Sequence, residues 1–146
     1  MATWFESNMS QHSQHHTVIV LTDKSQKNLK SKLENFIPND WIELSNEHVI
    51  EEGPASDNYK SHLGKKFTLI VKEIGFCTQT IAVKVSCDEI KSKDKIPHIT
   101  LATNPYVKGN TRASNDIVDW ISLKPFLNKN ELLTVEGILQ EINRDV

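Results

Sequence analysis

The stretch Lys95-Ile96-Pro97-His98-Ile99-Thr100-Leu101-Ala102 decides how the rest of the chain is interpreted. Its β-branched and apolar residues predict a short buried strand, and its proline fits only at the start of one, where the missing N–H costs no ladder bond. Because side chains alternate along a strand, His98 and Thr100 share one face, and Ile99 and Leu101 share the other. An imidazole beside a hydroxyl can hold a phosphate oxygen and move a proton. The same pattern also suits a hydrogen-bonded histidine next to a surface threonine.

Outward from this stretch, the sequence predicts several strands joined by short links, and one amphipathic helix. The helix begins at Thr22-Asp23, carries Leu29 and Leu33 on one side and ends before Pro38. Further strands are predicted over residues 15–21, 47–50, 66–75, 80–86 and 132–142. The four-residue link at 76–79 favours an antiparallel hairpin. Hairpins with few helices predict an α+β fold built on antiparallel sheet.

Composition places limits on the class of protein. A chain of 146 residues with 38% hydrophobic and 25% charged residues suits one globular domain, and a net charge of −2 argues against general binding of polyanions. No apolar run is long enough to span a bilayer and no leader is evident, so we expect a cytoplasmic protein. Cys77 and Cys87 lack a metal-ligand spacing and are expected to be reduced. Residues 1–14 are polar and aperiodic, which predicts a mobile tail before a single domain at 15–146.

Common catalytic motifs are missing from the sequence. It has no glycine-rich phosphate loop, no H-E-x-x-H and no nucleophile elbow, which argues against most nucleotide-binding and hydrolase classes. His12, His15 and His16 cluster near the start, but no third ligand follows at a usual metal spacing. A site built from isolated histidines on strands remains open, and we expect it to need neither metal nor cofactor.

The chain resembles the two-histidine phosphoesterase superfamily, in particular its RNA ligase-like and cyclic phosphodiesterase branch. Members carry two H-x-T/S motifs that face each other across a groove, and Pro97-His98-Ile99-Thr100-Leu101 is similar to the second motif. The flanking residues 92–96 and 114–117 also look like this branch, and the resemblance runs from Thr17 to Ile142. It implies two pseudo-symmetric lobes of antiparallel sheet, with flanking helices around a central groove, in one bilobal domain.

The first motif has two candidates. His15-His16-Thr17 satisfies H-x-T literally, which makes His15 and Thr17 one possible pair. His48-Val49-Ile50 has the histidine but carries isoleucine where the hydroxyl should be. Position favours His48, because in the family the first motif follows an opening strand and helix. A site with no functional first histidine is the third possibility.

The resemblance implies a metal-independent phosphodiesterase in which His48 and His98 form an acid–base pair and Thr100 holds the phosphate. Two imidazoles can transfer both protons near neutral pH, and a hydroxyl can stabilise a phosphate oxygen. The substrate would carry a 2′,3′-cyclic phosphate, an RNA end, or a cyclic or 2′,5′-linked oligonucleotide. Three residues of the following loop are expected to border the groove: Tyr106, Lys108 and Arg112.

Two other function classes stay open because of Ile50. One is a catalytically impaired module that binds a nucleotide or an RNA end without turnover. The other is a structural or interaction domain, in which His48 and His98 lie far apart. For the phosphodiesterase and for the impaired module, the partner is a nucleotide, oligonucleotide or RNA end. We expect a monomer and no membrane contact.

Overall fold

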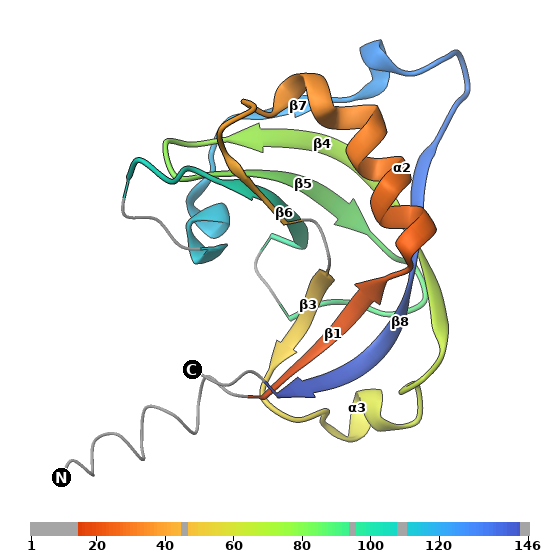
Figure 1. The fold of residues 1–146 in the computed structure, drawn as a ribbon. Coiled ribbons are helices and arrows are strands. Elements are labelled where there is room, and N and C mark those ends of the chain that lie inside the picture. Colours follow the sequence, from red (N-terminus) through yellow and green to blue (C-terminus); the bar gives the residue numbers. More distant parts are fainter. Residues whose placement is uncertain (1–14, 45–46, 94–95, 108–110, 144–146) are drawn as a thin grey trace, which may run out of the picture.

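The computed structural model describes residues 15–44, 47–93, 96–107 and 111–143, and these form an α+β fold dominated by one antiparallel sheet (Figure 1). The strand order is β2-β6-β5-β4-β8-β1-β3, and β7 pairs with β4 beside this path. The strands are β1 (His15–Leu21), β2 (Ile42–Glu43), β3 (Glu47–Glu52), β4 (Lys66–Phe76), β5 (Thr80–Ser86), β6 (His98–Thr103), β7 (Trp120–Ser122) and β8 (Leu133–Asn143). The helices are α2 (Asp23–Leu33) and α3 (Asp57–Lys60), with 3-10 turns η1 (Glu34–Phe36), η2 (Thr111–Asp116) and η3 (Lys124–Phe126). The predicted class, α+β with antiparallel sheet, is confirmed.

Helix α2 forms where the sequence predicts it. The Thr22 hydroxyl accepts a hydrogen bond from the Ser25 N–H at 3.2 Å, which caps the first turn. Leu29 and Leu33 are buried while the lysines between them face outward. The 3-10 turn η1 ends the helical segment just before Pro38.

The sheet curls until its two ends approach each other. Strand β3 ends the order on one side, and β6 lies next to the two-residue β2 on the other; β3 and β6 nevertheless lie against each other. Bulges bend the strands along this path: Ile50 is the extra residue in β3, Lys72 in β4 and Leu101 in β6. In Figure 1, β4, β5 and β6 form the upper part of the curl and β3, β1 and β8 the lower part.

The core lies inside this curl and is closed at the side by α2. Ile99 and Leu101 belong to it, as the predicted alternation of β6 requires, together with Ile19 of β1, Leu69 of β4 and Leu139 of β8. Each of these five side chains is 2% exposed or less. The opposite face of β6 therefore carries His98 and Thr100.

Shorter elements complete the fold. The segment 55–64 contains the single-turn helix α3, and the short strands β2 and β7 exist only through pairing with β6 and β4. Cys77 and Cys87 are free thiols, as expected. Within the described segments, no helix has the length and apolar character needed to cross a membrane. The tail predicted at residues 1–14 lies outside the described residues.

Gly137 tests the packing between β8 and β1. A Cβ at this position would lie 2.5 Å from the Ile19 Cγ2 and 2.7 Å from the backbone oxygen of Val20. Because backbone cannot move aside easily, we expect Gly137→Ala to lower the free energy of unfolding by about 1–3 kcal/mol or more. Urea denaturation measures this, with Thr134→Ala on the exposed face of β8 as the control. Equal stabilities of the two variants would contradict this account of the β1–β8 packing.

Candidate active site

His98 begins β6 and lies directly across from Lys84 of β5. Its Nδ1 is 2.6 Å from the carbonyl oxygen of Ile96, and a carbonyl oxygen can only accept a hydrogen bond. The hydrogen of the neutral ring is therefore assigned to Nδ1, which leaves the lone pair on Nε2. This hydrogen bond to the residue two positions before it holds the His98 ring in one orientation.

His48, in β3, is brought against His98 although the two are 50 residues apart in sequence. Its Nδ1 donates a hydrogen bond to the backbone oxygen of His98 at 3.1 Å, so its Nε2 also carries the lone pair. His48 is 2% exposed and His98 is 9% exposed. His48 lies opposite Ile19, a core residue of β1, whereas His98 lies on the face of β6 that points away from the core.

The surroundings of His48 keep its ring neutral. Burial is the main cause, since it disfavours the charged form; the nearby charge of His98 acts in the same direction, and the bond to the His98 carbonyl opposes it. Together they lower the pKa of His48 to about 4. At neutral pH, His48 is therefore a proton acceptor rather than a donor at Nε2.

Thr100 shares the outer face of β6 with His98, as predicted. Its hydroxyl belongs to a series of hydrogen bonds between three hydroxyl groups. The Thr100 Oγ1 lies 2.9 Å from the Oγ of Ser114 in η2, and Ser114 donates onward to the Thr80 hydroxyl at 3.2 Å. Since the one hydrogen of Ser114 goes to Thr80, the hydrogen of Thr100 goes to Ser114. Thr100 must turn its hydroxyl away from Ser114 before it can donate to a phosphate oxygen.

Ile50 occupies the position at which the resemblance requires a hydroxyl. It is 0% exposed and belongs to the core, and it is the bulge residue of β3. Its backbone is also engaged, because the Lys93 N–H donates to the Ile50 oxygen at 2.7 Å. The structure therefore offers no replacement hydroxyl at residue 50.

The alternative first motif lies elsewhere. His15 begins β1 four residues before Ile19, the partner of His48, which is roughly 13 Å along a strand. The Thr17 side chain is 0% exposed, and its hydroxyl donates to the Gly53 oxygen at 3.1 Å. The geometry thus brings His48, rather than His15, to His98.

Of the three predicted rim residues, the structure describes one side chain. Tyr106 is 73% exposed, and a hydrogen bond with the Asp40 carboxylate is the main cause that raises its pKa. This bond directs the phenol toward the segment before β2. Lys108 and the side chain of Arg112 lie outside the described part of the chain.

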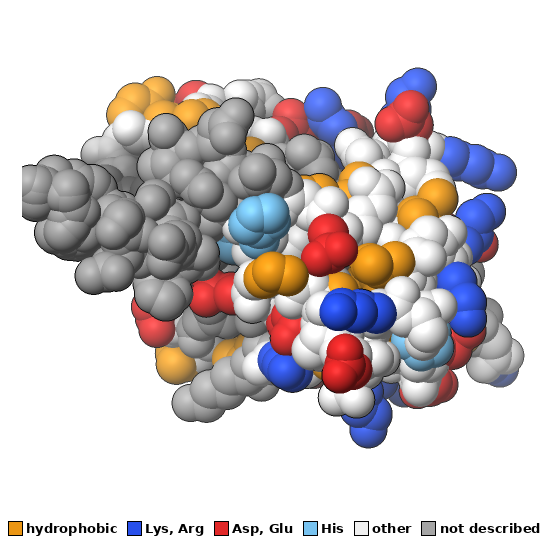
Figure 2. Space-filling view, turned by 90° about the horizontal axis from the view of Figure 1, so that it is seen from below, with side chains coloured by type: hydrophobic (Ala, Val, Ile, Leu, Met, Phe, Trp, Pro, Cys, Tyr) orange, Lys and Arg blue, Asp and Glu red, His pale blue; other side chains and the backbone are white. Residues whose placement is uncertain are grey.

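Lys84 is the residue that sequence reasoning missed. It is the cross-strand neighbour of His98, its Nζ lies 4.8 Å from the ring centre of Trp120, and it lies 3.7 Å from a Glu73 oxygen. Its signal in the sequence is the polar position within the alternating strand 80–86, but its place beside His98 depends on the register. On the face seen in Figure 2, basic and acidic side chains alternate among the described residues, in keeping with the small net charge.

Comparisons with known proteins add no identification: no model of a known protein family matches the sequence, and no curated protein matches it. Among the described residues, no group of three His, Cys, Asp or Glu side chains gathers as metal ligands would. Metal independence stays a prediction.

The burial of His48 predicts a specific loss of stability in mild acid. The pKa of His48 is about 4 in the folded chain and 6.5 in the unfolded chain, so between these values the unfolded state binds more protons. Stability therefore falls as the pH drops through this window, by about 2 kcal/mol from His48 alone between pH 7 and pH 5.

Urea denaturation across this pH range measures the effect, with His48→Asn as the comparison. The asparagine amide can still donate to the His98 carbonyl but does not titrate. We expect the pH slope of the variant to be shallower by that amount. Identical slopes in the two proteins would show that the His48 ring does not carry the effect.

Proposed function

We propose that the chain is a metal-independent phosphodiesterase that uses His48 and His98 as its acid–base pair. The observation that supports this most directly is the contact of the His48 ring with the backbone of His98, which brings histidines of two separate strands together, each ring anchored through Nδ1 to a backbone carbonyl. This anchoring places the lone pair of each neutral ring on Nε2, the atom that the proposed mechanism uses for proton transfer. It also argues against a structural domain in which the two histidines lie far apart.

The lowered pKa of His48 suggests its role in the proposed reaction. In the proposed hydrolysis of a 2′,3′-cyclic phosphate, His48 Nε2 takes a proton from the attacking water, because this ring is neutral at pH 7. The bond from phosphorus to one ribose oxygen breaks as the new bond forms. A protonated His98 then gives its Nε2 hydrogen to the departing oxygen, and Thr100 turns from Ser114 toward the phosphate.

The substrate class follows from the same groups. A cyclic mononucleotide, an RNA end and a cyclic or 2′,5′-linked oligonucleotide all present one phosphate to such a pair. We further propose that β3-β1-β8 and β4-β5-β6 act as two pseudo-symmetric lobes, each carrying one histidine, in a cytoplasmic monomer. Lys84 is the described cation nearest to His98 in register and would offset the phosphate charge.

The test is hydrolysis of 2′,3′-cyclic mononucleotides, an RNA with a cyclic phosphate end, and 2′,5′-linked and cyclic oligonucleotides, each in the presence of a chelator. We expect turnover of at least one substrate, with a loss of about 10²–10⁴-fold in His98→Ala and in His48→Asn. His62→Asn, at a histidine away from the site, is the matched control and should keep full activity. Near-normal turnover in either site variant would remove that histidine from the mechanism.

A second candidate is a module that binds the same phosphate without turnover. Two observations favour it: Ile50 supplies no hydroxyl, and His48 is 2% exposed, which restricts the access of water to its ring. Loss of a single donor to a developing negative charge costs about 10²–10³-fold in rate in other enzymes. This candidate predicts affinity for a cyclic phosphate in the absence of hydrolysis.

The pair Ile50→Thr and Ile50→Val separates the two candidates. Both substitutions trim the buried side chain to nearly the same shape, but only threonine adds a hydroxyl. If the domain has lost catalysis through residue 50, Ile50→Thr should hydrolyse the cyclic phosphate faster than Ile50→Val, by about tenfold or more. Equal rates in the two variants, with both folded by circular dichroism, would show that residue 50 does not limit the reaction.

A further inference from the structure

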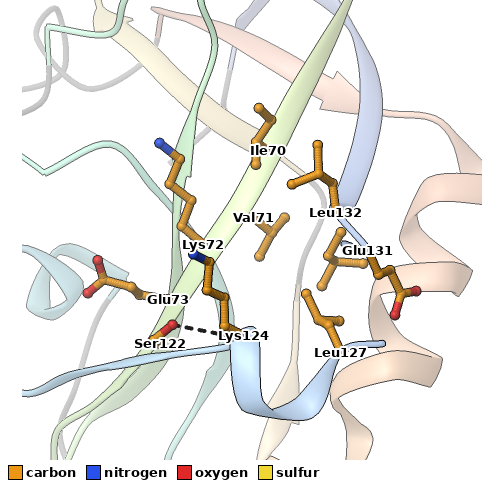
Figure 3. Close-up of a pocket in the computed structure, with 10 residues that line it drawn as sticks. Ile70, Val71, Lys72, Glu73, Ser122, Lys124, Leu127, Glu131 and Leu132 are labelled. Atoms are coloured by element: carbon orange, nitrogen blue, oxygen red, sulfur yellow. Dashed lines mark hydrogen bonds between the residues drawn. The ribbon is translucent and has the colours of Figure 1, made fainter. Parts of the chain in front are cut away.

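A groove of about 430 Å³ lies along one edge of β4, over the outer margin of the core (Figure 3). It opens where β4 changes partners: β8 pairs with it as far as Val71, and β7 pairs with it from Glu73 onward. Lys72, the bulge residue of β4, sits at this change. The bulge and the gap between the two partner strands together create the groove.

Hydrogen bonds fix both walls of the groove. On one side, the Leu123 N–H donates to the Lys72 oxygen at 3.0 Å, and the Lys124 N–H donates to the Ser122 hydroxyl at 3.2 Å. On the other side, Glu131 accepts from the Asn128 N–H at 2.8 Å. A groove that is already held in shape needs little ordering when a ligand binds.

The charges around the groove are unequal once their partners are considered. Glu131 is paired with Lys32 at 3.1 Å, and Glu73 with Lys84 at 3.7 Å, so both carboxylates are neutralised from outside the groove. Figure 3 shows these two carboxylates pointing to opposite sides. Lys72 and Lys124 form no ion pair with any described residue. The groove therefore carries two uncompensated positive charges.

The remaining lining is aliphatic. Val71 and Leu133 are buried and form the floor, Leu127 is half-buried, and Leu132 stands at the rim with 68% of its surface exposed. None of the residues that line the groove is aromatic, so a stacked base would find no platform. Two lysines at the edge of an aliphatic lining match an anionic head joined to a flexible hydrocarbon chain.

We propose that this groove binds a small amphipathic carboxylate, with the carboxylate between Lys72 and Lys124 and an aliphatic chain along Val71, Leu127 and Leu133. The volume lies in the range of small-molecule sites. The hydrocarbon chain leaves water on binding, and the carboxylate meets cations that the fold leaves without partners. This site is separate from the proposed phosphodiesterase chemistry and does not depend on it.

Methyl NMR titration of the full chain with octanoate, octanamide and acetate tests the assignment. Octanoate should shift the methyl signals of Val71, Leu127, Leu132 and Leu133 at millimolar concentration. Octanamide keeps the chain but lacks the charge, and should bind about five- to thirtyfold more weakly. Acetate keeps the charge but lacks the chain, and should cause no saturable shift of these methyl signals.

Lysine variants locate the charge. In the double variant Lys72→Met and Lys124→Met, octanoate should bind no more tightly than octanamide, while the affinity for octanamide stays unchanged. Lys66→Met, at an exposed position of the same strand, is the matched control and should bind octanoate like the wild type. Octanoate binding that is no tighter than octanamide binding in the wild type, or that survives the double variant, would overturn the proposal, as would the absence of methyl shifts.

Discussion

A hydrogen bond from the His48 Nδ1–H to the backbone oxygen of His98 links β3 to β6 across the curled sheet. Strands β3 and β6 are not neighbours in the strand order, and this side-chain bond connects them directly. His48 is 2% exposed, so a broken donor or acceptor there would stay unsatisfied, which costs about 1–3 kcal/mol. A neutral imidazole suits this place because it donates without bringing a charge into the interior.

The curl that makes this contact possible comes from bulges. Each of Ile50, Lys72 and Leu101 adds one residue to its strand relative to the partner, which bends the strand and increases its twist. The bulges at Ile50 and Leu101 lie within three residues of His48 and His98, and the bulge at Lys72 opens the groove on β4. The same three local irregularities therefore shape the core and both candidate sites.

Sequence reasoning recovered the elements better than their arrangement. β-Branched runs predicted β1, β4 and β5, and the cap at Thr22 predicted α2, because these signals are local. The bulges and the short strand β7 depend on partner strands, and no local pattern announces them. The neighbourhood of Lys84 and His98 is likewise a property of register, which a single sequence does not display.

In the proposed mechanism, the His48 ring has both a structural and a chemical role. The bond from Nδ1 that closes the sheet also fixes the tautomer of His48, and the burial that lowers its pKa to about 4 keeps Nε2 unprotonated at neutral pH. The same burial limits the access of water and weakens the ring as a base, since a low pKa reduces the drive to take a proton. Truncating His48 would remove both the hydrogen bond to the His98 carbonyl and the Nε2 atom. Asparagine instead keeps an N–H donor near the position of Nδ1 and removes Nε2. His98 has the reverse arrangement, because its backbone oxygen serves closure while its ring is free for chemistry. The contact between the strands and the proposed proton transfer therefore depend on different atoms of the two histidines. Variants that remove only Nε2 can distinguish a catalytic pair from a purely structural one.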